Sequence, residues 1–422
     1  MKSTKGSRMF KFDTLKAKTV KELKTGIKET LGTKYKKVFP NDKHAPILIK
    51  PNLNSNMNAL TGNTTDLRVV AAVIEFLKET GYSDITIGEG TNSGFYRSNI
   101  SVIQRLSYDK LCEHYGVKIK DFNYSDTVDV EFSKGVKARA ARECAEAALF
   151  INMPKLKTHF EAGMSICLKN LMGCLVGQPN KKKTHASLFE NIVNLNLTLK
   201  PHLHIVDAVV SMEGLGPTRG TPLMTGTVFF GTDPFLIDLM LAKFASFNIK
   251  KIGPIQNAIK RNIITNEHLN FVNNYNLAEV FSFKPPEAGP IATFIHHPKR
   301  QKYFLAVRNT AFFNYLCRTE IFGKILFATG LRQDVFIKDE MSCGGLSINQ
   351  AKCTKCGKCN DYCPLDIKLP ESFSKEGASK PLGCIECLYC YCICTERAID
   401  FHGELGFMAE QIRQYDDIIR KL

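Results

Sequence analysis

The sequence predicts an α/β protein in which a largely parallel sheet domain is followed by a small cysteine-rich α+β domain and a C-terminal helix. Over residues 46–245, short apolar runs alternate with helical apolar patterns, which is typical of a parallel sheet with crossover helices. Ten of the 15 cysteines lie between Cys343 and Cys394, and clustered thiols indicate a metal-bearing domain. The last apolar residues are spaced 4-3-4-3, which predicts an amphipathic helix.

The first 45 residues are expected to form a basic N-terminal segment. Residues 1–50 contain 14 Lys and Arg against 4 Asp and Glu, in a chain of formal net charge +16. Such a block can attract nucleic acid, an anionic membrane or an acidic protein. It contains no nucleic-acid-binding motif, so nucleic acid is not an expected partner. Because no uncharged apolar run of about 18 residues and no signal-peptide core occur, we expect a cytoplasmic protein without a transmembrane segment.

The α/β domain is expected at residues 46–294. Apolar runs that stop at proline, glycine or polar residues predict strands at residues 46–49, 84–87, 147–152, 204–207 and 227–231. Helical apolar spacing predicts helices at residues 69–77 and 188–199. Asp233 before Pro234 predicts a further helix that runs to Phe244, because aspartate is a favoured N-cap and proline is favoured at the first helical position.

Polar and charged side chains follow these predicted strands in larger numbers than packing requires. They are Lys50, Asn52, Lys155, Lys157, His159, Lys169, Asn170, His185, Asp207 and Arg219. In a parallel sheet the carboxyl ends of the strands meet at one edge, which is where α/β proteins bind ligands. The sequence therefore predicts a polar ligand site at that edge.

Two kinds of role are expected within this group. The candidates for binding an anionic ligand, a carboxylate or a phosphate, are Lys50, Asn52, Lys155, Lys169, Asn170 and Arg219. The candidate catalytic residues are His159 and His185, which titrate near neutral pH, together with Lys157 and Asp207. Lys155 and Lys157, which precede His159 in the same motif, should lower the pKa of His159. The structural alternative is that these lysines are solvated and that His159 only caps a loop.

The cysteines of the second domain, expected at residues 341–403, form two runs with the same spacing. The first run is Cys353, Cys356, Cys359 and Cys363, and the second is Cys384, Cys387, Cys390 and Cys394. This is the pattern of bacterial two-cluster ferredoxins, in which the fourth cysteine of each run ligates the other cluster. We therefore predict a ferredoxin-like domain with two [4Fe–4S] clusters, in which Cys394 completes the first ligand set and Cys363 the second. A pair of four-cysteine zinc sites is the alternative.

Two cysteines lie outside this ligand pattern. Cys392 adds a thiol inside the last gap of the second run, and no proline follows Cys394, whereas Pro364 follows Cys363. Cys392 could compete for a ligand position. Cys343 precedes the repeat and is expected to be a small buried side chain.

The remaining segments are a connector and the chain end. Residues 295–340 are basic and rich in aromatic side chains, and we expect a connector packed on its own protein; a segment lying on a membrane surface is the alternative. Residues 404–422 are expected to form the amphipathic C-terminal helix. Its apolar stripe consists of Met408, Ile412, Tyr415, Ile419 and Leu422. Docking on the body of the protein is the expected role of this stripe, and a dimer seam is the alternative.

The strand-end motifs resemble those of iron–sulfur proteins that carry the domain of unknown function 362. The motifs are Lys50-Pro51-Asn52, Pro154 to His159, Lys169 to Gly173, His185, Asp207, Gly216-Pro217 with Gly220, and Asp233-Pro234. The likeness covers residues 46–245, and members of this family often carry a C-terminal two-cluster ferredoxin module. The resemblance implies an iron–sulfur redox protein with an α/β partner domain, and it implies no substrate.

The leading functional hypothesis is an oxidoreductase. Electrons would come from a soluble donor, such as ferredoxin or flavodoxin, and pass through two [4Fe–4S] clusters to an anionic substrate or second cofactor in the α/β domain. A flavin is compatible with the sequence but not indicated, since no Gly-x-Gly-x-x-Gly fingerprint follows a strand. The alternative is a non-enzymatic electron carrier or maturation factor whose α/β domain recognises a protein client.

Overall fold

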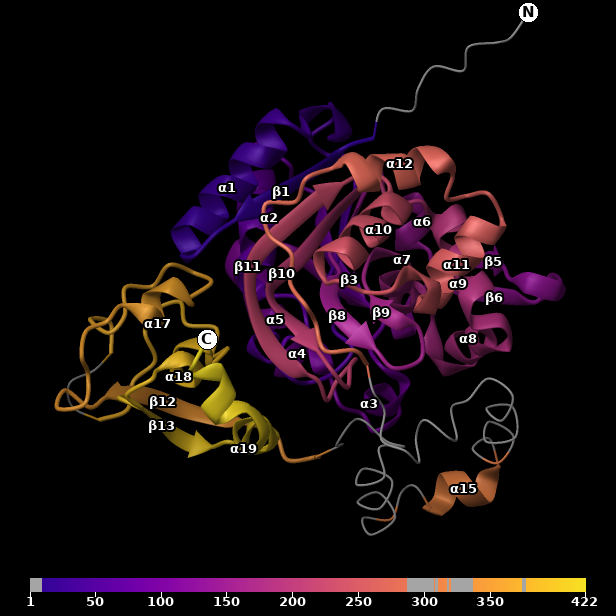
Figure 1. The fold of residues 1–422 in the computed structure, drawn as a ribbon. Coiled ribbons are helices and arrows are strands. Elements are labelled where there is room, and N and C mark those ends of the chain that lie inside the picture. The colour runs from indigo at the N-terminus through magenta and orange to yellow at the C-terminus, as the bar shows by residue number, and fades with distance from the viewer. Residues whose placement is uncertain (1–9, 287–306, 308–309, 317–318, 320–336, 374–376) are drawn as a thin grey trace, which may run out of the picture.

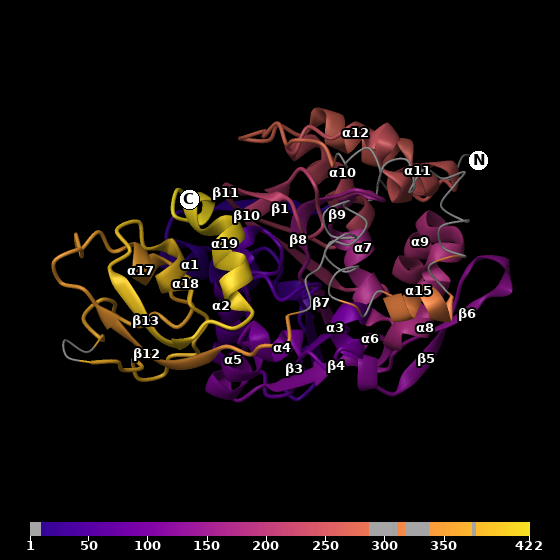
Figure 2. The same cartoon turned by 90° about the horizontal axis from the view of Figure 1, so that it is seen from below.

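The computed structural model describes residues 10–286, 307, 310–316, 319, 337–373 and 377–422. A large domain is built on a mixed sheet, and a smaller domain with the C-terminal helix lies beside it (Figure 1). Both views place the smaller domain on the side of the sheet domain that carries α1 (Val20–Thr33) and α2 (Leu67–Glu79) (Figure 2). The predicted fold class is confirmed.

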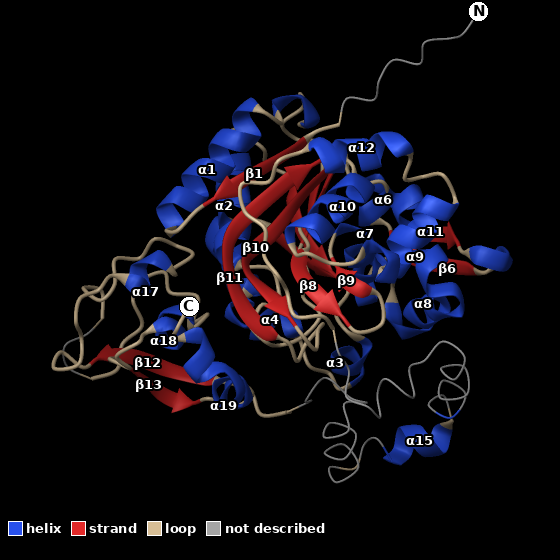
Figure 3. Ribbon diagram, viewed as in Figure 1, coloured by secondary structure: helices blue, strands red, loops and turns tan. Residues whose placement is uncertain are grey.

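The large sheet is parallel in its centre and antiparallel at one end (Figure 3). The strands run in the order β1-β11-β10-β7-β2-β3-β4, with β8 paired with β10 and β9 paired with β8. Their bounds are β1 (Phe12–Lys16), β2 (Ile47–Lys50), β3 (Ile85–Glu89), β4 (Lys118–Asp121), β7 (Leu149–Asn152), β8 (Lys155–His159), β9 (Gly163–Ser165), β10 (Leu203–Glu213) and β11 (Thr221–Gly231). From β4 to β10 neighbouring strands are parallel, while β11 is antiparallel to both β10 and β1. A further hairpin, β5 (Thr127–Glu131) and β6 (Lys137–Ala141), lies outside this sheet.

Helices cover both faces of the sheet because its strands are buried on both sides. In β2, Ile47 and Ile49 belong to the core that α1 and α2 cover, whereas Leu48 faces the opposite side. Apolar runs without polar alternation are typical of such doubly covered parallel strands. The remaining helices of at least eight residues in this domain are α5 (Tyr108–Tyr115), α8 (Gly177–Thr184), α9 (Leu188–Leu199), α10 (Pro234–Phe244), α11 (Gly253–Lys260) and α12 (Asn266–Asn274).

The predicted start of α10 is confirmed. The Asp233 carboxylate accepts hydrogen bonds from the backbone N–H groups of Phe235 and Leu236, at 2.9 and 3.2 Å, and Pro234 is the first helical residue. The bounds of α9 also match the prediction. Both helices could be located because capping and apolar spacing are local properties of the chain.

Part of the predicted basic N-terminal segment belongs to the sheet domain. Strand β1 pairs with β11, and α1 begins with a capping box in which Thr19 and Glu22 satisfy each other's backbone N–H groups. Lys24, on the buried side of α1, forms ion pairs with Glu75 of α2 at 2.7 Å and with Asp366 of the second domain at 2.5 Å. Fixed carboxylates therefore offset some of the positive charge of this segment.

The second domain contains a two-stranded antiparallel sheet and two short helices. They are β12 (Ser342–Ile348), β13 (Ile399–Glu404), α17 (Lys358–Asp361) and α18 (Tyr389–Ile393). Most of the predicted connector, residues 295–340, lies outside the described residues; within it the structure describes α15 (Ala311–Leu316). In the described part of the chain, no helix has the length and apolar character needed to span a bilayer.

The C-terminal helix α19 (Met408–Ile419) packs on its own chain. Met408, Tyr415 and Ile419 are buried in the same core as residues of α2, so three members of the predicted stripe dock as expected. Ile412, however, is only half-buried, and Gln411 is buried in its place. The Gln411 side-chain oxygen accepts a hydrogen bond from the Asn58 backbone N–H at 2.8 Å, so a polar contact replaces the expected apolar one.

Ile419→Asp is expected to lower the free energy of unfolding by about 3–5 kcal/mol, because it places an unpaired carboxylate where the side chain is 1% exposed. Ile418→Asp is the matched control, since the neighbouring Ile418 is 36% exposed and should cost less than about 0.5 kcal/mol. Chemical denaturation measures both values. An unchanged sedimentation coefficient in both variants is expected, whereas conversion of a dimer into stable monomers by Ile419→Asp would make α19 an oligomer contact.

Candidate functional site

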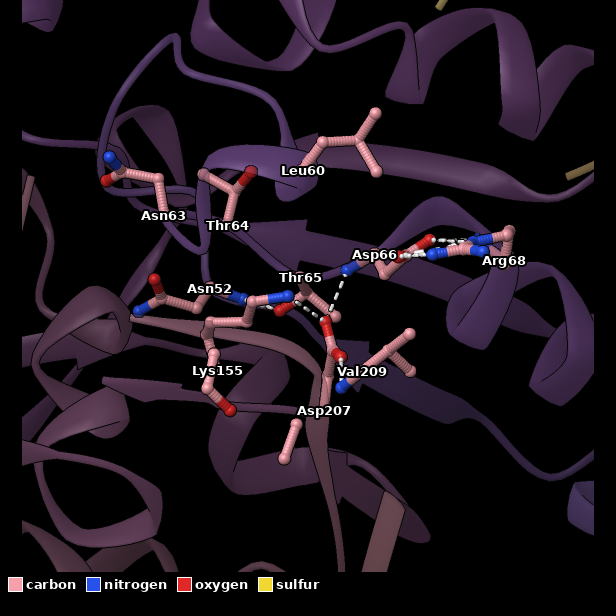
Figure 4. A network of polar contacts seen from close by, with 12 residues as sticks. Asn52, Leu60, Asn63, Thr64, Thr65, Asp66, Arg68, Lys155, Asp207 and Val209 are labelled. Carbon is pink, nitrogen blue, oxygen red and sulfur yellow. Dashed lines mark hydrogen bonds and ion pairs between the residues drawn. The ribbon is translucent and has the colours of Figure 1, made fainter. Parts of the chain in front are cut away.

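A buried polar network begins on β8 at the predicted ligand edge (Figure 4). The Lys155 ammonium donates to the Asp207 carboxylate at 2.8 Å, and neither side chain is exposed. The same carboxylate accepts hydrogen bonds from the backbone N–H groups of Asp66 at 2.7 Å and Val209 at 2.9 Å. All three donors converge because β8 lies next to β10 and the N-terminus of α2 reaches the same strand.

The network continues from α2 into the second domain. Arg68 forms a two-pronged ion pair with Asp66, with contacts of 2.7 and 3.1 Å. Although burial opposes ionisation, the Arg68 guanidinium lowers the pKa of the Asp66 carboxyl. Arg68 also donates to the backbone oxygen of Asp361 at 3.1 Å and lies 4.2 Å from the ring centroid of Tyr362. The polar chain therefore extends from β8 to the segment that carries Cys363.

Lys50 and Glu89 form a second buried ion pair at the ends of β2 and β3. Their Nζ and Oε2 atoms lie 2.9 Å apart, and Lys50 also donates to the Pro51 backbone oxygen at 3.0 Å. A Cβ atom at Gly173 would lie 1.8 Å from the Glu89 carboxylate, which requires glycine at this position. The charge of Lys50 is therefore already neutralised within the fold.

Lys157 and two asparagines link the loop after β2 to the rest of the edge. The Lys157 ammonium donates to the Asn52 side chain at 2.8 Å, to the Asn63 backbone oxygen at 2.7 Å, and to the Asn54 side chain. Asn52 in turn donates to the Asn170 side-chain oxygen at 2.8 Å. The structure thus brings together Asn52, Lys157 and Asn170 as predicted, but as mutually satisfied buried groups.

The ion pairs with Glu89 and Asp207 oppose the anion-binding role predicted for Lys50 and Lys155. A ligand could use either charge only by displacing a buried carboxylate, and an unpaired buried carboxylate costs several kcal/mol. The solvated state that the structural alternative gave to Lys155 and Lys157 is wrong, because both lysines are buried. Their observed role is to hold neighbouring strands and loops together.

His159 lies at the other end of β8, in the turn to β9. Its Nδ1 accepts hydrogen bonds from the backbone N–H groups of Glu161 at 3.1 Å and Ala162 at 3.3 Å. Nε2 must then carry the ring proton. Burial lowers the pKa of His159 well below its usual value, and the charge of Lys169 adds to this effect. The predicted lowering is confirmed, with burial as its main cause, and the ring also caps a loop as the structural alternative proposed.

Besides Lys157, three titratable groups lie around His159: Glu161, Lys169 and His185. The His185 Nδ1 atom lies 3.6 Å from the Glu161 carboxylate, and the histidine side chain is 35% exposed. Although burial opposes it, this contact lowers the pKa of Glu161. Burial lowers the pKa of the Lys169 ammonium to about 8. We call His159, Glu161, Lys169 and His185 the His159 group.

Lys169 differs from the other lysines at the edge. Among the described residues, its ammonium has neither a hydrogen-bond acceptor nor an ion-pair partner within direct contact. Its side chain is half-buried, so part of it reaches solvent. Such a group can bind an anion at little cost, because no existing contact has to be broken.

Arg219 lies elsewhere, at the contact between the sheet domain and α19. Tyr415 of α19 donates to the backbone oxygens of Thr218 and Gly220, at 3.3 and 3.1 Å, on either side of Arg219. Burial lowers the pKa of Arg219, and Tyr415 and Glu410 oppose that shift. The loop that carries Arg219 therefore serves domain docking.

The cysteines of the second domain come close to one another in two sets. One cavity is lined by thiols from both runs: Cys363, Cys384, Cys387 and Cys390. Burial raises the pKa of Cys359 to about 11, and Cys356 and Cys394, which both contribute to that shift, are its neighbours. Four converging thiols in a largely apolar cavity fit the donor set of a [4Fe–4S] cluster.

Cys392 points away from that cavity, toward the sheet domain. Its sulfur accepts hydrogen bonds from the side-chain amides of Asn58 at 3.9 Å and Gln411 at 3.7 Å. Burial raises the pKa of Cys392 to about 12, so the thiol stays protonated. This geometry does not support a role for Cys392 as a competing cluster ligand. Cys343 is buried, as expected.

Sequence reasoning missed three residues of these networks. Asp66 and Arg68 lie two positions apart at the start of α2, and only the preference of aspartate for N-cap positions could have indicated Asp66. Glu161 follows the Pro154 to His159 motif directly, but a single acidic residue in a turn carries no specific signal. Their importance comes from partners distant in the sequence.

Comparisons with known proteins identify both domains. Residues 47–243 match the domain of unknown function DUF362, and residues 345–395 match a 4Fe-4S dicluster domain. A thylakoid-associated protein of Synechocystis sp. is 30% identical over 228 residues, and the match covers 50% of this chain and 66% of that protein, which is less than two thirds.

Two solved structures show weaker similarity. The lactate racemase apoprotein from Thermoanaerobacterium thermosaccharolyticum is 12% identical with a TM-score of 0.36, covering 50% of this chain and 52% of that one. A protein from Thermotoga maritima is 12% identical with a TM-score of 0.27, covering 52% and 56%. The two family matches indicate a DUF362-like region at residues 47–243 and a 4Fe-4S dicluster region at residues 345–395, which implies iron–sulfur electron transfer.

Proposed function

We propose that this chain is an iron–sulfur oxidoreductase that delivers electrons from two [4Fe–4S] clusters to an anionic small molecule, a substrate or second cofactor, bound by the His159 group. The observation that carries the proposal is the Lys169 ammonium, which lacks a direct acceptor among the described residues and lies near His159 and Glu161. When bound, the clusters would supply single electrons.

The ligand sets that we propose follow the gathering of thiols. One cluster would be held by Cys353, Cys356, Cys359 and Cys394, and the other by Cys384, Cys387, Cys390 and Cys363. Support comes from the cavity that the second set lines and from the closeness of Cys394 to the first run. Zinc is the alternative occupant, and metal analysis distinguishes the two.

Each member of the His159 group would have a distinct task. Lys169 would bind the anion, because its charge is not spent on a carboxylate in direct contact. His159 would donate a hydrogen bond from Nε2, since its Nδ1 is occupied by two backbone N–H groups. His185, which is half-exposed and paired with Glu161, would exchange protons with solvent.

Strand β8 connects this site to the cluster domain. Lys155 and His159 are its two ends, and a strand rise of about 3.3 Å per residue places them roughly 13 Å apart. The Lys155 end is tied through Asp207, Asp66 and Arg68 to the segment before Cys363. This packed path holds the cluster domain at a fixed position relative to the ligand site.

Lys169→Met tests the anion site with inorganic phosphate as the probe. At pH 7 the variant is expected to bind phosphate at least about tenfold more weakly than the parent, the usual scale for a lost charge-assisted contact. The parent itself should lose affinity as the pH rises through about 8, because the Lys169 ammonium then deprotonates, and the variant should lack this step. Titration calorimetry from pH 6.5 to 9.5 measures both effects.

Lys260→Met, at an exposed position on α11, is the matched control and should bind phosphate like the parent. His159→Gln should keep its iron content and its reduction by dithionite while reductant-driven consumption of any co-purified anion falls by about 100-fold. Equal phosphate binding by parent and Lys169→Met over the whole pH range would exclude the small-molecule site. The maturation-factor alternative, with a protein client, would then be favoured.

A further inference from the structure

The two proposed ligand sets differ in how they face solvent. In the first, Cys356 is exposed, and Cys353, Cys359 and Cys394 are half-exposed. In the second, Cys363 is buried, and Cys384, Cys387 and Cys390 are half-exposed like three members of the first set. Cys387 also lines a cavity between the domains together with Thr65 and Tyr108 of the sheet domain. The first set therefore lies toward solvent and the second toward the α/β domain.

Positive charge surrounds the exposed set. Lys352 and Lys355 are exposed, Lys358 is half-exposed, and the three alternate with Cys353, Cys356 and Cys359 along the loop. None of these lysines forms an ion pair with the described residues. The nearest acid in sequence to Cys394 is Glu396, which is exposed, while the adjacent Arg397 is paired with Asp416 and Asp417.

On the side of the second set, Lys368 is exposed and forms no ion pair with the described residues, but two further lysines are paired with an acid. Lys110 and Lys380 each form a 2.8 Å ion pair with Glu386. Attraction of an acidic partner to this side would be weaker, since the local positive charge is partly neutralised. The α/β domain also covers part of it, through the ion pair of Lys24 with Asp366 and the contact of Arg68 with Asp361.

We propose that residues 352–358 are the docking surface for a small acidic electron-transfer protein, so that electrons enter at the cluster held by Cys353, Cys356, Cys359 and Cys394 and leave through the other cluster toward the α/β domain. This inference rests on the cluster assignment within the proposed function. Electron transfer slows steeply with distance, so a donor must dock where a cluster is nearest to the surface. Complementary charge speeds encounter and fixes orientation in such short-lived complexes.

The test uses a flavodoxin as the acidic one-electron donor and the double variant Lys352→Glu/Lys355→Glu. We expect flavodoxin binding about tenfold or more weaker than for the parent, with a shallower dependence of affinity on salt. Carbodiimide cross-linking of the parent should join flavodoxin carboxylates to Lys352 or Lys355. Iron content and reduction by dithionite should be unchanged, because a small reductant needs no docking surface.

Lys260→Glu is the control for net charge. Its helix, α11, lies at the opposite side of the molecule from the second domain in both orthogonal views (Figures 1 and 2). An equal loss of flavodoxin affinity in Lys260→Glu would overturn the proposal, as would cross-links confined to Lys110 and Lys380, or parent-like binding by the double variant. Donor binding is read without any substrate, so failure of the phosphate site would leave this result standing.

Discussion

Asp207→Ala is expected to lower the free energy of unfolding by about 3–5 kcal/mol, the scale for removing one partner of a buried ion pair. The substitution would leave the Lys155 ammonium fully buried without its carboxylate. It would also remove the acceptor of the Asp66 backbone N–H, which begins α2. Urea denaturation followed by circular dichroism measures the change.

A double-mutant cycle separates this pair from its surroundings. Asp207→Ala/Lys155→Met removes both charges, so it should be less destabilised than the sum of the two single variants by at least about 1 kcal/mol. Additive losses would show that the two side chains do not stabilise each other. An unchanged stability of Asp207→Ala alone would contradict the buried position of the network.

Cys359→Ser is expected to lower the iron content of anaerobically purified protein by about half. The parent should contain about eight iron and eight acid-labile sulfide per chain, from two four-iron clusters. Cys359 lies in the thiol set with Cys356 and Cys394, so its loss should remove one cluster and leave the second, whose cavity it does not line.

Cys392→Ser is the matched control from the same domain. Its sulfur contacts Asn58 and Gln411 instead of the cavity, so about eight iron should remain. Iron analysis and electron paramagnetic resonance of the reduced protein provide the two readouts. Zinc in place of iron in the parent, or equal iron loss in both variants, would contradict the assignment.

The sequence alone determined the features that depend on neighbouring residues. Apolar runs and caps located β2, β3, β7, α9 and α10, since the energetics of a strand or a helix end lie within a few residues. The cysteine spacing indicated the dicluster domain for the same reason, because three thiols of each set come from one short loop. The predicted parallel order of the strands also placed Asn52, Lys157 and Asn170 at one edge of the sheet, where the structure has them.

Only the tertiary structure decided which of the charged side chains are free to act. Lys50 and Lys155 looked equivalent to Lys169 in the sequence, but they meet Glu89 and Asp207, which lie 39 and 52 positions away. Similarly, Gln411 replaces Ile412 at the domain contact because Asn58, 353 positions earlier, presents a backbone donor there. Buried charges and polar groups are stable only with partners, and those partners come from strands and loops that the fold brings together. The local pattern therefore identified the edge of the sheet, while the three-dimensional pairing singled out Lys169 and the His159 group.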